Sequence, residues 1–156
     1  MKQALLIVDV QPCFEPPTWL VERANLLSTA FPSVATVERH DESIVPFQRQ
    51  LGWHPAKDDQ SLVAADHVVI KHGYRPTREA IDLLRSFNPD RVLVCGIQAE
   101  TCVLAAGFAL FDAGLHPTII ADAVVGSSLD RSGQLGVKLW EHHFGQVVHS
   151  FKELLD

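Results

Sequence analysis

Short apolar runs, separated by polar segments and turn residues, recur along the chain. Six of them are nearly continuous in apolar residues rather than alternating, which is typical of parallel strands that are covered on both faces. We predict strands over residues 4–10, 33–38, 67–71, 91–97, 117–123 and 146–151. The segments between them show helical spacing, and we predict helices over 18–30, 43–51, 77–86, 99–113 and 128–143.

Strands that alternate with helices predict an α/β fold. We expect a three-layer, doubly wound, Rossmann-like six-stranded parallel sheet with helices on both faces and right-handed crossovers. Thr77 is placed to cap one helix at its start, and Gly114 is placed to end another. The region 39–66 is the least regular, and we interpret it as a loop-rich flap beside the active site. Such sites lie at the carboxyl ends of the strands, near the switch in strand order.

Length and composition narrow the class of protein. The 156 residues suit one domain over 1–156, and 47% of them are hydrophobic. A formal charge of −6 without basic clusters argues against nucleic acid as a partner. Asp9 interrupts the first apolar run, so we interpret that run as a strand rather than a signal peptide, and we expect a cytoplasmic protein without a membrane span. Three cysteines without a Cys-x-x-Cys pair argue against a disulfide framework or a zinc knuckle.

Three residues with polar or reactive side chains stand at the carboxyl ends of predicted strands. Asp9 ends "LLIVD", Lys71 ends "HVVIK" and Cys102 follows "RVLVCGI". The carboxylate is suited to take the thiol proton and the ammonium to stabilise a thiolate. Each residue alone has a structural explanation, as a helix cap, a solvent-facing lysine or a packed cysteine, but their shared position favours a catalytic group.

The segment "VCGIQAETCVLAAGFALFDAG" adds to this hypothesis. If a helix begins near 99–101, the Cys102 thiol lies in its first turn, where free N–H groups and the helix dipole favour an anion. We therefore expect a low thiol pKa. The same N–H groups are suited to bind an oxyanion formed at a substrate carbonyl.

Four segments resemble the isochorismatase-like cysteine hydrolase superfamily, which includes nicotinamidases and N-carbamoylsarcosine amidases. They are "LLIVDVQPCF" with Asp9, Gln11 and Phe14, "VVIKHGYRPT", the cysteine segment quoted above, and "IIADAVVGSS". The resemblance covers essentially the whole chain in order. It implies a catalytic triad of Cys102, Asp9 and Lys71, in which Cys102 attacks a carbonyl, Asp9 carries its proton to the leaving group and Lys71 holds the charges. It also implies a cis peptide bond at Ile97–Gln98 and an oxyanion hole formed by the N–H groups of Gln98 and Cys102.

Nicotinamidases in this superfamily bind a metal through an Asp-x-His pair and further histidines. Here Glu38 and His40 stand at comparable spacing and His54 follows, but the set is not complete, and the segment "RQLGWHP" resembles that of metal-free members. We therefore predict no metal and no cofactor.

Substrate-pocket walls are predicted at four positions. Phe14 follows the first strand and Trp53 lies in the flap, while Tyr74 and Arg75 follow the lysine strand. Arg75 either faces the pocket, where it would select a polar group, or faces solvent.

The function that these residues predict is hydrolysis of an amide or ureido C–N bond of a small molecule. Three alternatives remain open: vinyl-ether hydrolysis with Asp9 as the acid, a flavodoxin-like binding module without catalysis, and a redox sensor that uses Cys102 with Cys13. The resemblance further implies a homodimer or homotetramer.

Overall fold

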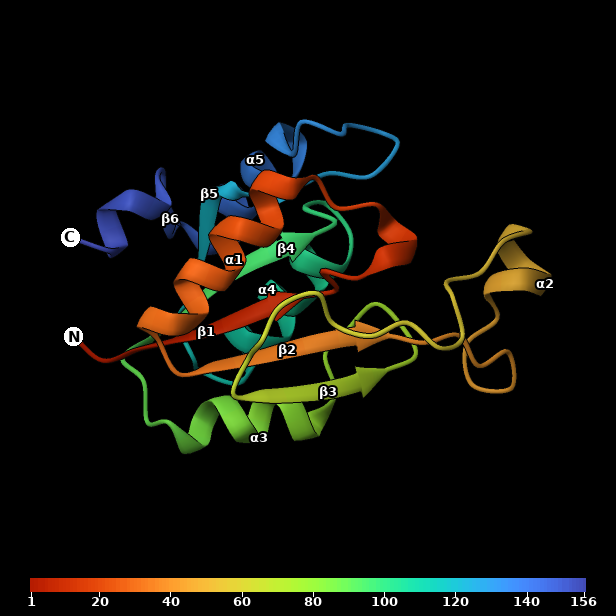
Figure 1. Cartoon of the computed structure of the whole chain (residues 1–156), viewed down its shortest axis with the longest axis horizontal. Coiled ribbons are helices and arrows are strands. Elements are labelled where there is room, and N and C mark those ends of the chain that lie inside the picture. Colours follow the sequence, from red (N-terminus) through yellow and green to blue (C-terminus); the bar gives the residue numbers. More distant parts are fainter.

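The computed structural model, which describes residues 1–156, contains a six-stranded parallel sheet (Figure 1). Its strands are β1 (Gln3–Val8), β2 (Ser33–Glu38), β3 (His67–Lys71), β4 (Arg91–Ile97), β5 (Pro117–Val125) and β6 (Val147–Val148). Its helices are α1 (Thr18–Ala30), α2 (Phe47–Leu51), α3 (Arg78–Ser86), α4 (Cys102–Asp112) and α5 (Gln134–Phe144), with short 3₁₀ helices at Pro12–Phe14 and Phe151–Leu154. The α/β fold with a parallel sheet is thus confirmed.

The strand order is β3-β2-β1-β4-β5-β6, and every pairing is parallel. The order reverses between β1 and β4, which are neighbours in the sheet. Crevices form at the carboxyl ends of the strands at such a switch point. The residues that follow β1 and β4 therefore meet at one edge of the sheet.

Two hydrophobic cores cover the two faces of this sheet. Along β1, Leu5 and Ile7 pack on one face and Leu6 and Val8 on the other, as the period-two geometry of a strand requires. Buried residues of α1 and the C-terminal 3₁₀ helix complete one core, and buried residues of α3, α4 and α5 complete the other. The three layers expected from the sequence are present. No helix combines the length and the apolar composition that crossing a membrane requires.

Gly96 makes the sharp exit from β4 possible. Its φ is +126°, and a Cβ at this position would collide with the backbone of Val8 on the neighbouring strand. The pairing of β4 with β5 also shifts register between Val94 and Gly96. The chain can therefore pass close to β1 and turn into the segment that leads to α4.

Several predicted elements are shorter in the structure than the patterns indicate. The helix expected over 99–113 covers only Cys102–Asp112, and the strand expected over 4–10 ends at Val8. The helix expected over 43–51 covers only 47–51, and that expected over 128–143 begins at Gln134. Residues 128–133 instead form a turn in which the Asp130 carboxylate accepts hydrogen bonds from the N–H groups of Ser132 and Leu135. Pairing of the last strand stops at Val148, because the chain turns there into a 3₁₀ helix at Phe151.

The ends of two other helices agree with the sequence signals. Thr77 caps α3 by accepting a hydrogen bond from the Ala80 N–H, and Gly114 adopts a left-handed conformation just after α4. The flap, residues 39–66, contains α2, which lies beyond the carboxyl ends of the strands and away from the two termini (Figure 1). The last part of this region returns across the molecule to the start of β3, where Val63 joins the core on the α1 face.

Candidate active site

Asp9 and Lys71 form a buried ion pair at the carboxyl edge of the sheet. Asp9 directly follows β1 and Lys71 ends β3, and both side chains are about 1% exposed or less. Lys71 Nζ lies 2.9 Å from Asp9 Oδ2, and it also donates to the carbonyls of Gly73 at 2.7 Å and Tyr74 at 3.1 Å. The three protons of the ammonium thus each have an acceptor, which a buried lysine requires.

The second oxygen of Asp9 is held from β2. Thr36 Oγ1 donates a hydrogen bond to Asp9 Oδ1 at 2.8 Å, and the Asp9 N–H bonds to the carbonyl of Thr36 at 3.1 Å. Burial raises the pKa of Asp9, while the Lys71 ammonium opposes that rise. Burial by itself lowers the pKa of Lys71, but the neighbouring acids, Asp9 most of all, outweigh it and raise the pKa above its usual value. The lysine therefore stays charged.

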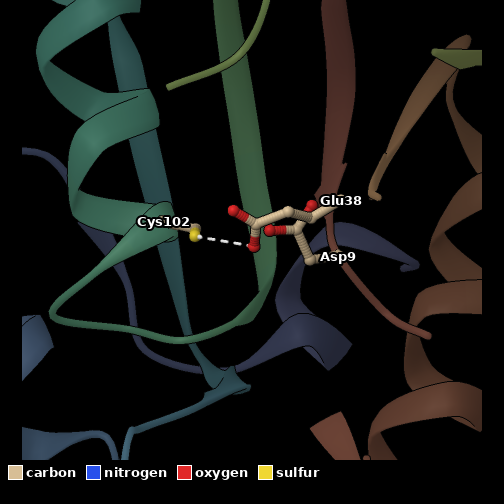
Figure 2. A group of neighbouring side chains, drawn as sticks. All are labelled: Asp9, Glu38 and Cys102. Atoms are coloured by element: carbon tan, nitrogen blue, oxygen red, sulfur yellow. Dashed lines mark hydrogen bonds between the residues drawn. The ribbon is translucent and has the colours of Figure 1, made fainter. Parts of the chain in front are cut away.

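Cys102 is the first residue of α4, and its thiol points to this pair of residues. A carboxylate oxygen of Asp9, one of Glu38 and the Cys102 Sγ all lie within 4.8 Å of one another (Figure 2). The thiol donates a hydrogen bond to Glu38 Oε2 at 3.8 Å. The residues that the sequence singled out at three strand ends, Asp9, Lys71 and Cys102, are therefore neighbours in space.

The pKa of the Cys102 thiol differs from the expectation. Burial raises it well above its usual value, Asp9 and Glu38 raise it further, and Lys71 alone lowers it. The low thiol pKa predicted from the helix start is therefore wrong, because the thiol is only 4% exposed and faces two acids. In the resting state the sulfur carries its proton.

Two backbone N–H groups beside the thiol lack an acceptor. The Ile97–Gln98 peptide bond is cis, as the resemblance implies, and the Gln98 N–H donates no hydrogen bond within the chain. Cys102 is the first helical residue, so its N–H has no partner within α4 and takes part in none of the loop or cap hydrogen bonds. Such a pair of free donors is what an oxyanion hole contains.

A cavity of about 540 Å³ opens above the thiol. Of the four predicted walls, Phe14, Trp53 and Tyr74 line it, whereas Arg75 is exposed and lies outside its lining. The prediction that Arg75 faces the pocket is corrected in favour of its solvent-facing alternative. The further lining residues are Cys13, Glu15, Glu38, His54, Pro55, Gln98, Thr101, Cys102, Ser127, Ser128 and Arg131.

Most of these further lining residues were not identified as site residues from the sequence, and two of them, Arg131 and Glu38, make contacts that bear on the site. Arg131 reaches the carbonyl oxygens of Phe14 and Glu15, more than 100 positions away, a contact that no local pattern signals. Glu38 was considered only as a metal ligand, although it ends the run "SVATVE" as Asp9 and Lys71 end theirs. Its position at a strand end, shared with Asp9 and Lys71, was the signal by which the sequence could have identified Glu38 as a site residue.

Glu38, His40 and His54 do not come together as metal ligands. His40 Nε2 lies 3.0 Å from Glu42 Oε1, and its ring stacks on His54 with the centroids 4.3 Å apart. Neither histidine belongs to a group of three or more side chains whose ligand atoms converge. The one group that does converge, Asp9, Glu38 and Cys102, already has the Lys71 ammonium beside it, so its donors do not fit a metal ion.

Comparisons with known proteins agree with this architecture. The sequence model of the isochorismatase domain matches residues 3–150. The chain is 26% identical, over 153 residues, to isochorismatase domain-containing protein 2 of Danio rerio, covering 86% of this chain and 72% of that protein.

Solved structures share the fold at low sequence identity. N-carbamoylsarcosine amidase of Thermoplasma acidophilum aligns with a TM-score of 0.76 at 23% identity, over 97% of both chains. The pyrazinamidase of Pyrococcus horikoshii, solved in complex with zinc, aligns with a TM-score of 0.77 at 21% identity, over 96% of this chain and 99% of that one. Since the domain match spans nearly the whole sequence, the chain belongs to the isochorismatase-like hydrolase family.

Proposed function

We propose that the protein hydrolyses an amide or ureido C–N bond of a small molecule through a thioester on Cys102. The observation that carries this proposal is the convergence of a thiol, a carboxylate and an ammonium beside two unpartnered backbone N–H groups. Amidases and nicotinamidases among the structural relatives act on C–N bonds of the same kind.

Each group has a role that its surroundings support. Cys102 attacks the carbonyl carbon as its proton passes to Asp9 Oδ2, which accepts no hydrogen bond apart from its ion pair with Lys71. Because the thiol pKa is raised, proton transfer accompanies the attack rather than preceding it. The Gln98 and Cys102 N–H groups then bind the oxyanion. Lys71 keeps Asp9 in place and offsets the negative charge that moves through the site.

The test is a panel of primary amides and N-carbamoyl amino acids, assayed for released ammonia or amine. We expect Cys102→Ala to abolish turnover and Cys95→Ala, which removes a thiol buried in β4, to retain it. Acid-quenched wild-type protein should carry the acyl group on the peptide that contains Cys102, and hydroxylamine should release it as a hydroxamate.

Other results would assign the site differently. Full turnover by Cys102→Ala would exclude the thioester, and activity on a vinyl ether would then assign the reaction to Asp9 as the acid. A reversible Cys13–Cys102 disulfide without any turnover would favour a redox sensor.

We further propose that the protein acts in the cytoplasm as a homodimer or homotetramer. Size-exclusion chromatography with light scattering, run at the concentration used in the activity assay, tests the assembly. An active species of 17.3 kDa would contradict it.

A further inference from the structure

The site contains a second acid that the triad does not use. Glu38 ends β2, its side chain is buried, and Cys102 donates a hydrogen bond to its Oε2 (Figure 2). Its Oε1 has no hydrogen-bond partner. We propose that Glu38 is a further catalytic residue, which protonates the leaving nitrogen and then activates the water that hydrolyses the thioester. This rests on the proposed function and assigns two of its proton transfers.

The two acids of the site differ in what surrounds them. Both oxygens of Asp9 are engaged, one by Lys71 and one by Thr36, and Asp9 does not line the cavity. Glu38 does line it, beside Cys102. Of the two acids, Glu38 is therefore the one that reaches the cavity in which a leaving group would lie over the thiol.

Gln11 fixes the position of Glu38. Its side-chain Oε1 accepts from the Glu38 N–H at 2.7 Å, and its Nε2 donates to the Glu38 carbonyl at 2.8 Å. The amide therefore binds both backbone polar groups of Glu38, as a neighbouring strand would. The end of β2, and with it the glutamate, is held in register with the segment after β1.

The surroundings of Glu38 favour its protonated form. Asp9 on the β1 side, Lys71 from β3 and Cys102 from α4 face Glu38, so two carboxyl groups share one ammonium. That ammonium is bonded to Asp9 and not to Glu38. Burial raises the pKa of Glu38 to about 7, with Asp9 raising it and Lys71 opposing the rise. The other ionisable residues that line the cavity are Cys13, Glu15, His54, Tyr74 and Arg131.

The proton transfers balance over the whole reaction. The Cys102 sulfur bonds to the carbonyl carbon while its proton passes to Asp9. When the C–N bond breaks, the proton of the Glu38 carboxyl passes to the nitrogen, which leaves as amine or ammonia. Water then attacks the thioester and gives a proton back to Glu38. Finally the C–S bond breaks and Cys102 recovers its proton from Asp9, so that amide and water yield acid and amine.

The test compares two substrates with the same acyl group: the amide on which the wild type is most active in the panel, and the corresponding 4-nitrophenyl ester. The ester has a leaving group that needs no proton. In Glu38→Gln we expect kcat/KM on the amide to fall by about 10²-fold or more, the usual scale of general acid–base catalysis. On the ester, the burst of nitrophenol in Glu38→Gln should keep its wild-type amplitude, and its rate should lie within about 10-fold of the wild-type rate. Turnover after the burst should be slow, because acyl-enzyme accumulates when Glu38 cannot activate the water.

Controls separate this inference from the proposed function. Glu141→Gln, an exposed change on α5, should match the wild type on both substrates, and formate should restore part of the amide activity of Glu38→Ala. Equal losses on amide and ester, or no loss on the amide, would overturn the role of Glu38 and leave these transfers to Asp9. A nitrophenol burst in Cys102→Ala, or a wild type that cleaves no amide, would overturn the proposed function itself.

Discussion

Replacing Glu38 by glutamine removes a buried ionisable group while keeping the shape of its side chain. The change leaves both hydrogen bonds from Gln11 in place, because they bind the Glu38 backbone. It also retains an oxygen able to accept the Cys102 hydrogen bond. The stability of the variant relative to wild type therefore reports mainly on the charge of Glu38.

The expected size of the effect follows from the pKa. Burial raises the pKa of Glu38 to about 7 from its usual 4.5. Because the value in the folded protein is the higher one, the folded state binds more protons than the unfolded chain between these pH values, and stability falls as pH rises through that interval. A pKa difference of about 2.5 corresponds to a loss of about 3 kcal/mol by pH 8.5. Glu38→Gln has no carboxyl group at this position, so its stability does not fall in this way.

Urea unfolding of both proteins at pH 5.5, 7.0 and 8.5 measures the difference. We expect the stability of Glu38→Gln relative to wild type to increase by about 2 kcal/mol from pH 5.5 to pH 8.5, since part of the loss is already present at pH 5.5. Glu141→Gln, at an exposed position, should follow the wild type at every pH. A constant offset between Glu38→Gln and wild type would refute the reasoning, because it would mean that Glu38 titrates alike in the folded and unfolded states.

Three further perturbations test other parts of the site. Lys71→Met leaves the buried Asp9 carboxylate without its counterion, so we expect it to lower the free energy of unfolding, measured in urea at pH 7, by about 3–5 kcal/mol. Adding Asp9→Asn removes the unpaired charge and should restore much of this loss. Gly96→Ala places a Cβ against the Val8 backbone, so we expect a marked loss of soluble expression or melting temperature; wild-type stability would contradict the close approach. Because the thiol pKa is raised, alkylation of Cys102 by iodoacetamide, followed by peptide mass spectrometry, should still accelerate above pH 9; a plateau near pH 7 would contradict the burial argument.

The sequence predicted correctly those features that a single residue or a local pattern determines. Continuous apolar runs predicted the six parallel strands, because a strand buried on both faces leaves no room for polar residues. The same rule made Asp9 and Lys71 conspicuous at strand ends.

Features that depend on contacts distant in sequence could not be predicted in this way. The Glu38 side chain turns to the thiol while His40, two residues on, pairs with Glu42, and nothing in their spacing distinguishes these directions. The thiol pKa was mispredicted for a related reason. The helix start was visible in the sequence, but the depth of burial and the second acid facing Cys102 were not.

The strand order explains why these four chemical groups meet at one edge of the sheet. Neighbouring strands β3, β2 and β1 end in Lys71, Glu38 and, one residue later, Asp9, and β4 leads into Cys102. A buried site with two carboxyl groups and one ammonium is closest to neutral when one acid stays protonated, because an unpaired buried charge is costly. Lys71 and Thr36 both bind Asp9, and so they favour Asp9 over Glu38 as the ionised acid in the proposed mechanism. The proposed hydrolysis of a C–N bond needs both states at once, a base for the thiol and an acid for the leaving nitrogen, and in the proposed mechanism the adjacent strands β1 and β2 supply them.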